Sequence, residues 1–171
     1  MNSPEPAEIT YRLASDADAA LLAKLARDTW TPHYVPIIGA EQVSYMLDKF
    51  QSENAIRRDL QNGYTYELAL ADGIACGYCA TRADSDAYFL SKLYVLESCR
   101  GRGIARTLVT HAEERARQYG ASLLCLTCNK RNSGSLTAYA HMGFASTGEC
   151  VTPIGAGFVM DDYLLEKRLN T

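Results

Sequence analysis

The chain has 171 residues, of which 47% are hydrophobic and 22% are charged, and its formal net charge is -3. This length and composition are typical of one globular domain that buries its own core. A nucleic-acid-binding chain usually carries a basic excess, so the acidic balance argues against nucleic acid as a partner. Any bound anion must therefore be held by a local basic cluster.

The sequence shows no targeting or membrane segment. Residues 1–8 are polar and contain proline, with no apolar run behind them, which argues against a secretory signal. No stretch approaches the about 18 apolar residues of a membrane helix. We expect a cytoplasmic protein without a membrane partner, organised as a single domain over residues 1–171.

The first half of the sequence alternates strand and helix patterns. Apolar residues recur at helical spacing from Leu21 to Trp30, and Pro32 and Pro36 are expected to break the chain after this helix. The elements predicted in this half are a strand at Ile9–Leu13, that first helix, helices at 41–50 and Glu53–Gln61, and hairpin strands at 64–71 and 74–81 around the turn Asp72-Gly73.

The second half predicts a strand–helix–strand crossover, which supplies a parallel pair of strands. A strand at 88–96 leads through a glycine-containing turn into the helix Ile104–Tyr119 and then into a strand at 122–128. The continuous apolar run of that last strand is typical of one buried on both faces. A short helix at 133–142 and strands at 144–152 and 158–169 follow. The order predicts an α/β (α+β) fold with a mixed sheet.

Two Cys-x-x-Cys pairs, Cys76/Cys79 and Cys125/Cys128, raise the question of a metal site. Residues three apart in a strand point to opposite faces, so neither pair is expected to chelate one ion. The gap between the pairs is also longer than the about 15–20 residues of a zinc ribbon. We therefore expect no metal and interpret these cysteines as reduced side chains of the core.

A basic, glycine-containing turn joins the strand at 88–96 to the following helix. The first turn of a helix has unpaired N–H groups and the positive end of the helix dipole. Glycines let the backbone approach an anion closely, and arginines add charge-assisted hydrogen bonds. The turn therefore predicts a pyrophosphate site. Its residues are Arg100, Gly101, Arg102, Gly103, Ile104, Ala105 and Arg106.

Other interpretations of this turn are weaker. The dinucleotide-binding fingerprint needs a third glycine where Arg106 stands, and the Walker loop needs a Gly-Lys-Ser/Thr that is absent. A plain helix start with surface arginines and a regulatory domain that binds nucleotides both remain alternatives.

A second motif follows the crossover strand, and with it the sequence resembles the GNAT acetyltransferases. The phosphate loop of that family reads Gln/Arg-x-x-Gly-x-Gly/Ala, and a later signature reads Asn-x-x-small-x-x-x-Tyr-x-x-x-Gly-Phe. The first is matched by Arg100, Gly103 and Ala105, and the second by Asn132, Ser135, Tyr139, Gly143 and Phe144. The resemblance covers residues 73–144 well and the N-terminal third only by the order of elements.

The resemblance implies a fold and a co-substrate. The fold is a mixed sheet of about seven strands with flanking helices, in which a parallel pair splays at a bulge. Acetyl-CoA would bind there, its pantetheine arm along Leu93 and Val95 and its pyrophosphate on the backbone of residues 100–105. Asn132 would hydrogen-bond the pantetheine arm, and Tyr139 would lie near the thioester sulfur.

The implied reaction is transfer of the acetyl group to a primary amine. Tyr139 is the candidate catalytic residue, since a positioned phenol can donate a hydrogen bond to the departing thiolate. Its alternative is a core tyrosine on a short helix. No general base is assigned: His33, Asp161 and Asp162 are the candidates. Lys92 has the wrong charge for that role.

The acceptor is expected to be a small molecule held by two segments, residues 30–38 and 155–163. Their aromatic and carboxylate side chains suit a cationic amine, although they also fit a core and a solvated strand edge. Residues 88–95, with Asp162, Leu164, Leu165 and Lys167, resemble bacterial polyamine-type acetyltransferases in part. Alternatives are an acceptor that is a protein or peptide N-terminus, which needs an open groove, and a CoA-binding sensor without catalysis. The family resemblance also allows a homodimer.

Overall fold

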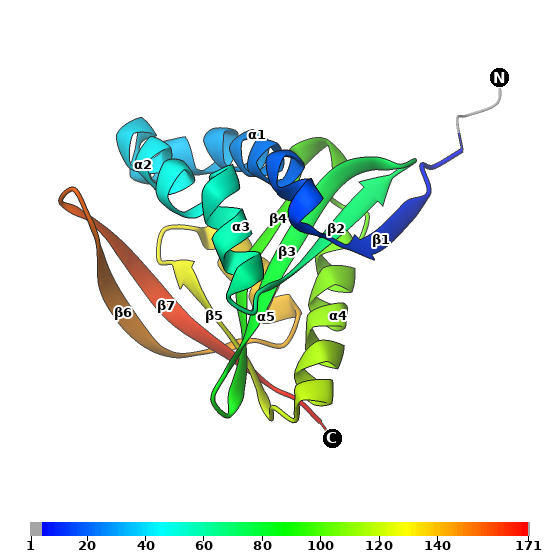
Figure 1. Ribbon diagram of the computed structural model, residues 1–171. Helices are drawn as coiled ribbons and strands as arrows, with labels where there is room; N and C mark the ends of the chain where they lie inside the picture. Colours follow the sequence, from blue (N-terminus) through cyan, green and yellow to red (C-terminus); the bar gives the residue numbers. More distant parts are fainter. Residues whose placement is uncertain (1–4, 171) are drawn as a thin grey trace.

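A computed structural model describes residues 5–170 and places them around one seven-stranded sheet (Figure 1). Residues 1–4 and Thr171, the two ends of the predicted domain, lie outside the described part. The elements are β1 (Ile9–Leu13), α1 (Ala19–Ile38), α2 (Ala40–Phe50), α3 (Glu53–Gln61), β2 (Thr65–Ala71), β3 (Ile74–Asp84), β4 (Ala87–Val95), α4 (Ile104–Tyr119), β5 (Leu123–Asn129), α5 (Ser133–His141), β6 (Ala145–Gly155) and β7 (Phe158–Arg168). Single 3-10 turns at Asp16–Asp18 and Glu97–Cys99 precede α1 and α4.

The strand order is β1-β2-β3-β4-β5-β7-β6, and β4 with β5 is the parallel pair in this sheet. This confirms the predicted mixed sheet and its crossover. Figure 1 shows α1, α2 and α3 over one face of the sheet and α4 over the other. The β6–β7 hairpin extends along the sheet toward α2. Within the described residues, no helix is long and apolar enough to cross a bilayer.

Helix α1 is longer than predicted. Pro32 and Pro36 lie inside it, and it continues to Ile38, so the predicted break was wrong. Each proline removes one backbone hydrogen bond, a cost of about 3 kcal/mol in an isolated helix. Packing opposes that cost here, because Trp30 and Ile38 belong to an apolar cluster with α2 and the β6–β7 hairpin.

Two strand-level predictions also differ from the structure. Cys76 and Cys79 do not face opposite sides of the sheet: a bulge in the β2–β3 register leaves Cys76 unpaired, and both cysteines join the core beneath α4. β5 is not buried evenly on both faces, since Thr127 is exposed. No group of three or more metal-ligating side chains occurs within residues 5–170.

Candidate active site

The parallel strands β4 and β5 pair for only a short distance. Residues 87–89 of β4 face residues 123–125 of β5, and beyond that point the strands separate. The separation coincides with a bulge: Ala80 of β3 faces Lys92, while the next residue, Thr81, faces Leu90, so Ser91 is an extra residue in β4. A bulge increases local twist and re-aims the side chains that follow it. The splay at a bulge that the family resemblance implied is confirmed.

A cavity of about 870 Å³ occupies the opened region. It is bounded by side chains from both splayed strands, by α1 and α2 on one face of the sheet, and by α5 on the other. The predicted site residues that line it are Leu93, Val95, Arg100, Ala105, Asn132 and Tyr139. The structure therefore gathers around one cavity residues that lie far apart in the sequence.

The phosphate loop forms a second cavity of about 310 Å³. Gly101 and Gly103 have φ angles of 75° and 76°, a left-handed conformation that glycine adopts without strain. The loop residues that line this cavity are Arg100, Gly101, Gly103, Ile104, Ala105 and Arg106. Because Arg100 and Ala105 line both cavities, the two spaces adjoin.

The three loop arginines differ in where their side chains lie. Arg102, expected to bind the cofactor, is not among the lining residues, and its guanidinium donates a 2.6 Å hydrogen bond to the carbonyl of Ala7. Arg106 does line the cavity, although it matches no family motif position. Its place in the first turn of α4 was the signal available in the sequence.

Tyr139 lies on α5 and is half-buried at the wall of the larger cavity. Its ring packs edge-on against Phe144, with 5.6 Å between ring centroids. Burial raises the pKa of Tyr139, so the hydroxyl stays protonated at neutral pH. A protonated phenol at this position can donate a hydrogen bond to a developing negative charge.

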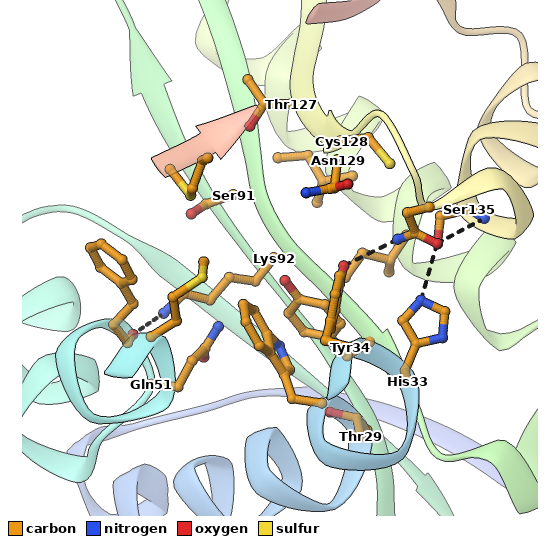
Figure 2. Close-up of a pocket in the computed structure, with 18 of the residues that line it drawn as sticks. Thr29, His33, Tyr34, Gln51, Ser91, Lys92, Thr127, Cys128, Asn129 and Ser135 are labelled. Atoms are coloured by element: carbon orange, nitrogen blue, oxygen red, sulfur yellow. Dashed lines mark hydrogen bonds between the residues drawn. The ribbon is translucent and has the colours of Figure 1, made fainter. Parts of the chain in front are cut away.

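Asn132 is buried, and protein groups already occupy both ends of its amide. The side-chain oxygen caps α5 by accepting a hydrogen bond from the N–H of Ser135 at 3.4 Å. The same oxygen lies 3.0 Å from Nε2 of His33, which must therefore carry a proton as the donor. The amide nitrogen donates to the hydroxyl of Tyr34 at 3.2 Å. Figure 2 shows His33 and Tyr34 turned toward the start of α5, near Ser135.

The three candidate bases occupy different environments. Asp161 is not among the cavity-lining residues and forms a 2.9 Å ion pair with Lys130. Asp162 and His33 both line the cavity. The Asp162 side chain is buried, and burial raises its pKa against the opposing effect of a hydrogen bond from Thr127.

Lys92 is a buried cation at the α2–α3 end of the cavity (Figure 2). Its ammonium donates to the hydroxyl of Tyr66 at 2.6 Å, the carbonyl of Phe50 at 2.8 Å and the carboxylate of Asp59 at 3.1 Å. Burial lowers the pKa of Lys92, while Asp59 opposes the shift. Since its three hydrogens are all used, Lys92 holds the bulged strand against the helices, a role that sequence reasoning missed.

The β6–β7 hairpin closes one side of the cavity by packing on α2. The Tyr45 hydroxyl donates to the carbonyl of Ile154 at 2.6 Å, and the Gln42 amide donates to the carbonyl of Val159 at 2.8 Å. Met160 of β7 lines the cavity beneath this contact. The two segments expected to hold the acceptor, 30–38 and 155–163, also meet, because Trp30 and Ile38 share an apolar cluster with Phe158 and Met160.

Known proteins share this architecture. The chain is 29% identical to an uncharacterized N-acetyltransferase of Mycobacterium tuberculosis over 89% of its own length and 98% of that protein. It is 23% identical to a spermidine N(1)-acetyltransferase of Thermoplasma acidophilum, over 80% of the chain and 88% of that protein. The fold matches the PaiA N-acetyltransferase of Thermoplasma acidophilum, solved with coenzyme A, with a TM-score of 0.81, 22% identity and coverage of 94% of the chain and 99% of that structure.

The splayed strands, the glycine turn at the start of α4 and the Asn–Tyr–Gly–Phe signature thus occur together in one fold. The acetyltransferase (GNAT) family profile matches residues 22–144, which span the splay, the turn and the signature. The chain therefore belongs to the acetyltransferase (GNAT) family and is an acyltransferase.

Proposed function

We propose that the chain transfers the acetyl group of acetyl-CoA to the primary amine of a small molecule. The observation that carries this proposal is the continuity of two cavities, one over the phosphate loop and one between the splayed strands. Together they offer an anion site joined to a deep chamber, the combination that a long thioester with a diphosphate requires.

The phosphate end of acetyl-CoA would lie on the first turn of α4. The unpaired N–H groups there and the guanidinium groups of Arg100 and Arg106 supply donors for the pyrophosphate. Gly101 and Gly103 keep side chains out of that space: a Cβ atom at either glycine would meet nothing within 4 Å.

The pantetheine arm would run along the open edge of β4 beside Leu93 and Val95. Unpaired strand backbone binds an extended ligand as a further strand. Asn132 is a proposed contact as well, and a hydrogen bond from the arm to its side-chain oxygen would have to share or replace the one from His33.

The reaction at the thioester needs two kinds of help. A backbone N–H of the splayed strand, at Leu93 or its neighbour, would polarise the carbonyl. Tyr139 would donate a hydrogen bond to the sulfur as the carbon–sulfur bond breaks. The Tyr139 hydroxyl has no protein hydrogen-bond partner among residues 5–170, so it is available for such a bond.

A small acceptor fits the closed side of the cavity better than a polypeptide does. The contacts of Tyr45 and Gln42 with the β6–β7 hairpin cover the side on which a peptide groove would have to open. The aromatic side chains of Trp30, Tyr34 and Tyr94 face one another there, which favours an amine with a positive charge. The likeness to a spermidine acetyltransferase is in keeping with a polyamine acceptor.

Two experiments test the proposal in sequence. Calorimetric titration with acetyl-CoA, ATP and NAD should show binding of acetyl-CoA alone, whereas ATP or NAD binding at this site would favour a nucleotide-binding regulator. Turnover of acetyl-CoA is then followed with putrescine, spermidine, benzylamine, glycinamide and short peptides. Tight binding of acetyl-CoA with no turnover of any amine would support the non-catalytic sensor instead.

A further inference from the structure

Asp162 is a buried carboxylate that forms no ion pair within residues 5–170, and the charge of Lys130 reaches it only as a minor effect. It lies on β7 opposite Asn129, at the splayed end of β5, and only 6% of the residue is exposed. Its side chain lines the larger cavity. No lysine, arginine or histidine forms an ion pair with it in the part of the chain that the structure covers, since Lys130 pairs with Asp161 and Glu149. A buried charge without a partner is costly, and a cationic ligand would relieve that cost.

An aromatic wall lines the same cavity as this carboxylate. Trp30 and Tyr34 have ring centroids 4.5 Å apart, and Tyr94 packs edge-on to both. All three rings line the cavity. Burial is the main cause of the raised pKa of Tyr34, and the charge of Asp162 adds a minor contribution in the same direction. Aromatic faces next to a carboxylate form a site for an alkylammonium group.

Tyr34 is oriented in a way that suits this site. Its oxygen accepts the hydrogen bond from the Asn132 amide, so its own proton is directed elsewhere. The N–H of Ser135 can only donate, and it faces the Asn132 oxygen, which fixes the orientation of the amide. The Asn132 amide therefore holds the Tyr34 hydroxyl in the cavity wall, where Tyr94 is a second hydrogen-bond neighbour.

We propose that Asp162 is the acceptor-binding and general-base residue: its carboxylate pairs with the ammonium form of a primary amine and removes the proton that blocks attack. This inference rests on the proposed function and adds to it the form in which the acceptor binds. Asp161 lies outside the cavity beside Lys130, and Nε2 of His33 is hydrogen-bonded to Asn132. Neither group therefore has the same access to an amine in the cavity.

The proton balance of the step is complete. The ammonium gives one proton to Asp162, and the free electron pair of nitrogen forms the new bond to the thioester carbon. The carbon–sulfur bond breaks, and its electron pair leaves with sulfur. The thiolate takes a proton from Tyr139, which recovers one from the nitrogen as it becomes an amide. Asp162 then releases its proton to solvent, so the reaction yields the acetamide, the free thiol and one proton.

The burial of Asp162 assists the transfer. Burial raises the pKa of the Asp162 carboxyl, which makes this carboxylate a stronger base than an exposed one. The hydrogen bond from Thr127 and the charge of Lys130 oppose the shift.

The direct test compares Asp162→Asn with Asp161→Asn, a neighbouring carboxylate outside the cavity. We expect Asp162→Asn to lower kcat/KM for putrescine, spermidine and benzylamine about 100-fold or more, the ordinary range for loss of a general base. Its affinity for acetyl-CoA should stay within threefold of wild type, and Asp161→Asn should change kcat/KM less than threefold. An Asp162→Asn enzyme that keeps at least a third of wild-type kcat/KM overturns the inference.

A pH profile of the wild-type enzyme tests the same idea if the variant does not fold. With Asp162 as the base, kcat/KM rises as the carboxylate ionises and is then flat through neutral pH. The midpoint of this rise falls at the same pH for glycinamide and putrescine. If the enzyme takes the free base from solution, kcat/KM keeps rising to the pKa of each amine, and the inference is wrong. The other groups facing Asp162 are Tyr34 of α1, Cys128 of β5, Asp161 of β7 and Lys130; the pKa of Cys128 is raised to about 12.

The two levels of proposal fail differently. If the wild-type enzyme acetylates no amine, the proposed function and this inference are both refuted. Normal wild-type turnover with an active Asp162→Asn enzyme, or with a profile that follows the amine pKa, refutes this inference alone.

Discussion

Nε2 of His33 and the side-chain oxygen of Asn132 lie 3.0 Å apart although 99 residues separate them in the sequence. This hydrogen bond joins α1 to the start of α5 across the opened sheet. It exists because α1 continues through Pro32, which places His33 and Tyr34 on a further turn of the helix. Asn132 thus connects a wall of the cavity to the helix that carries Tyr139.

Replacing Asn132 with alanine should destabilise the protein. The change removes the cap of α5, worth about 1 kcal/mol. It also leaves His33 Nε2 and the Tyr34 hydroxyl without their part-buried hydrogen bonds, at about 1 kcal/mol or more. We expect the free energy of unfolding to fall by about 2–3 kcal/mol in urea. Asn132→Asp keeps the helix cap and the oxygen that accepts from His33, so its free energy of unfolding should fall by less. Equal losses for the two variants would contradict this view of the network.

Tyr139→Phe should lower kcat about 100-fold if the hydroxyl assists departure of the thiolate. The ring would keep its packing against Phe144, so calorimetric affinity for acetyl-CoA should stay nearly constant. Tyr119→Phe is the matched control, because that tyrosine lies against Tyr88 and outside the cavity. An unchanged kcat in Tyr139→Phe would remove the assignment.

The loop arginines should differ in their effect on acetyl-CoA binding. Arg106→Ala and Arg100→Ala should each weaken the affinity about tenfold, because a charge-assisted hydrogen bond contributes about 1.5 kcal/mol or more. Arg102→Ala should weaken it less, since that guanidinium is bonded to Ala7. Calorimetry at two salt concentrations checks this order, with Arg117→Ala, near the far end of α4, as the control. A larger loss from Arg102→Ala than from Arg106→Ala would show that the loop binds phosphate in another conformation.

Asp59→Asn should destabilise the fold strongly. It leaves the ammonium of Lys92 buried without its carboxylate, a change that typically costs about 3 kcal/mol. Asp28→Asn breaks an exposed pair with Lys24 and should cost about 0.5 kcal/mol or less. Thermal and urea unfolding measure both. The double variant Asp59→Asn with Lys92→Met should be more stable than Asp59→Asn alone, and the reverse order would refute the buried-charge explanation.

Acid should weaken the N-terminal turn in a defined pH range. The Arg12 guanidinium and the N–H of Ser15 lower the pKa of Asp18 from 3.8 to about 2. The folded state therefore binds fewer protons than the unfolded state in this range, and the stabilising contribution is present above about pH 4 and is lost as the pH falls toward 2. Asp18→Asn should flatten the stability curve over that interval. Asp84→Asn is the control, because it breaks a more exposed ion pair with Arg82 and should leave the stability curve unchanged over that interval.

Local patterns predicted most of the fold. The helices Glu53–Gln61 and Ile104–Tyr119 have the predicted bounds, since a serine cap marks the first and glycines flank the second. The Asp72-Gly73 hairpin turn is also as predicted, with positive φ at both residues. The continuation of α1 through Pro32 and Pro36 was not predictable, because the packing that stabilises it comes from the β6–β7 hairpin, which is distant in the sequence.

The site was only partly predictable for the same reason. Motif spacing identified Tyr139, Asn132 and the loop, and the structure places them on adjoining cavities. Motif spacing did not identify the bonds of Asn132 to His33 and Tyr34 or the three bonds of Lys92, which join residues more than 25 positions apart. The same-face placement of Cys76 and Cys79 depends on a bulge, and a bulge has no reliable signal in a strand sequence.

The single extra residue in β4 also makes the site sensitive to chain length. Ser91 changes which alternate side chains face α4: Tyr88 and Leu90 do so before it, and Leu93 and Val95 after it. Removing Ser91 would restore an uninterrupted β3–β4 ladder in which Leu90 and Leu93 still face α4. It would also take away the bulge, and with it the added local twist where β4 separates from β5. A one-codon deletion could thus abolish the chamber while leaving every motif residue of the family in the gene, a kind of loss that motif matching alone would not detect.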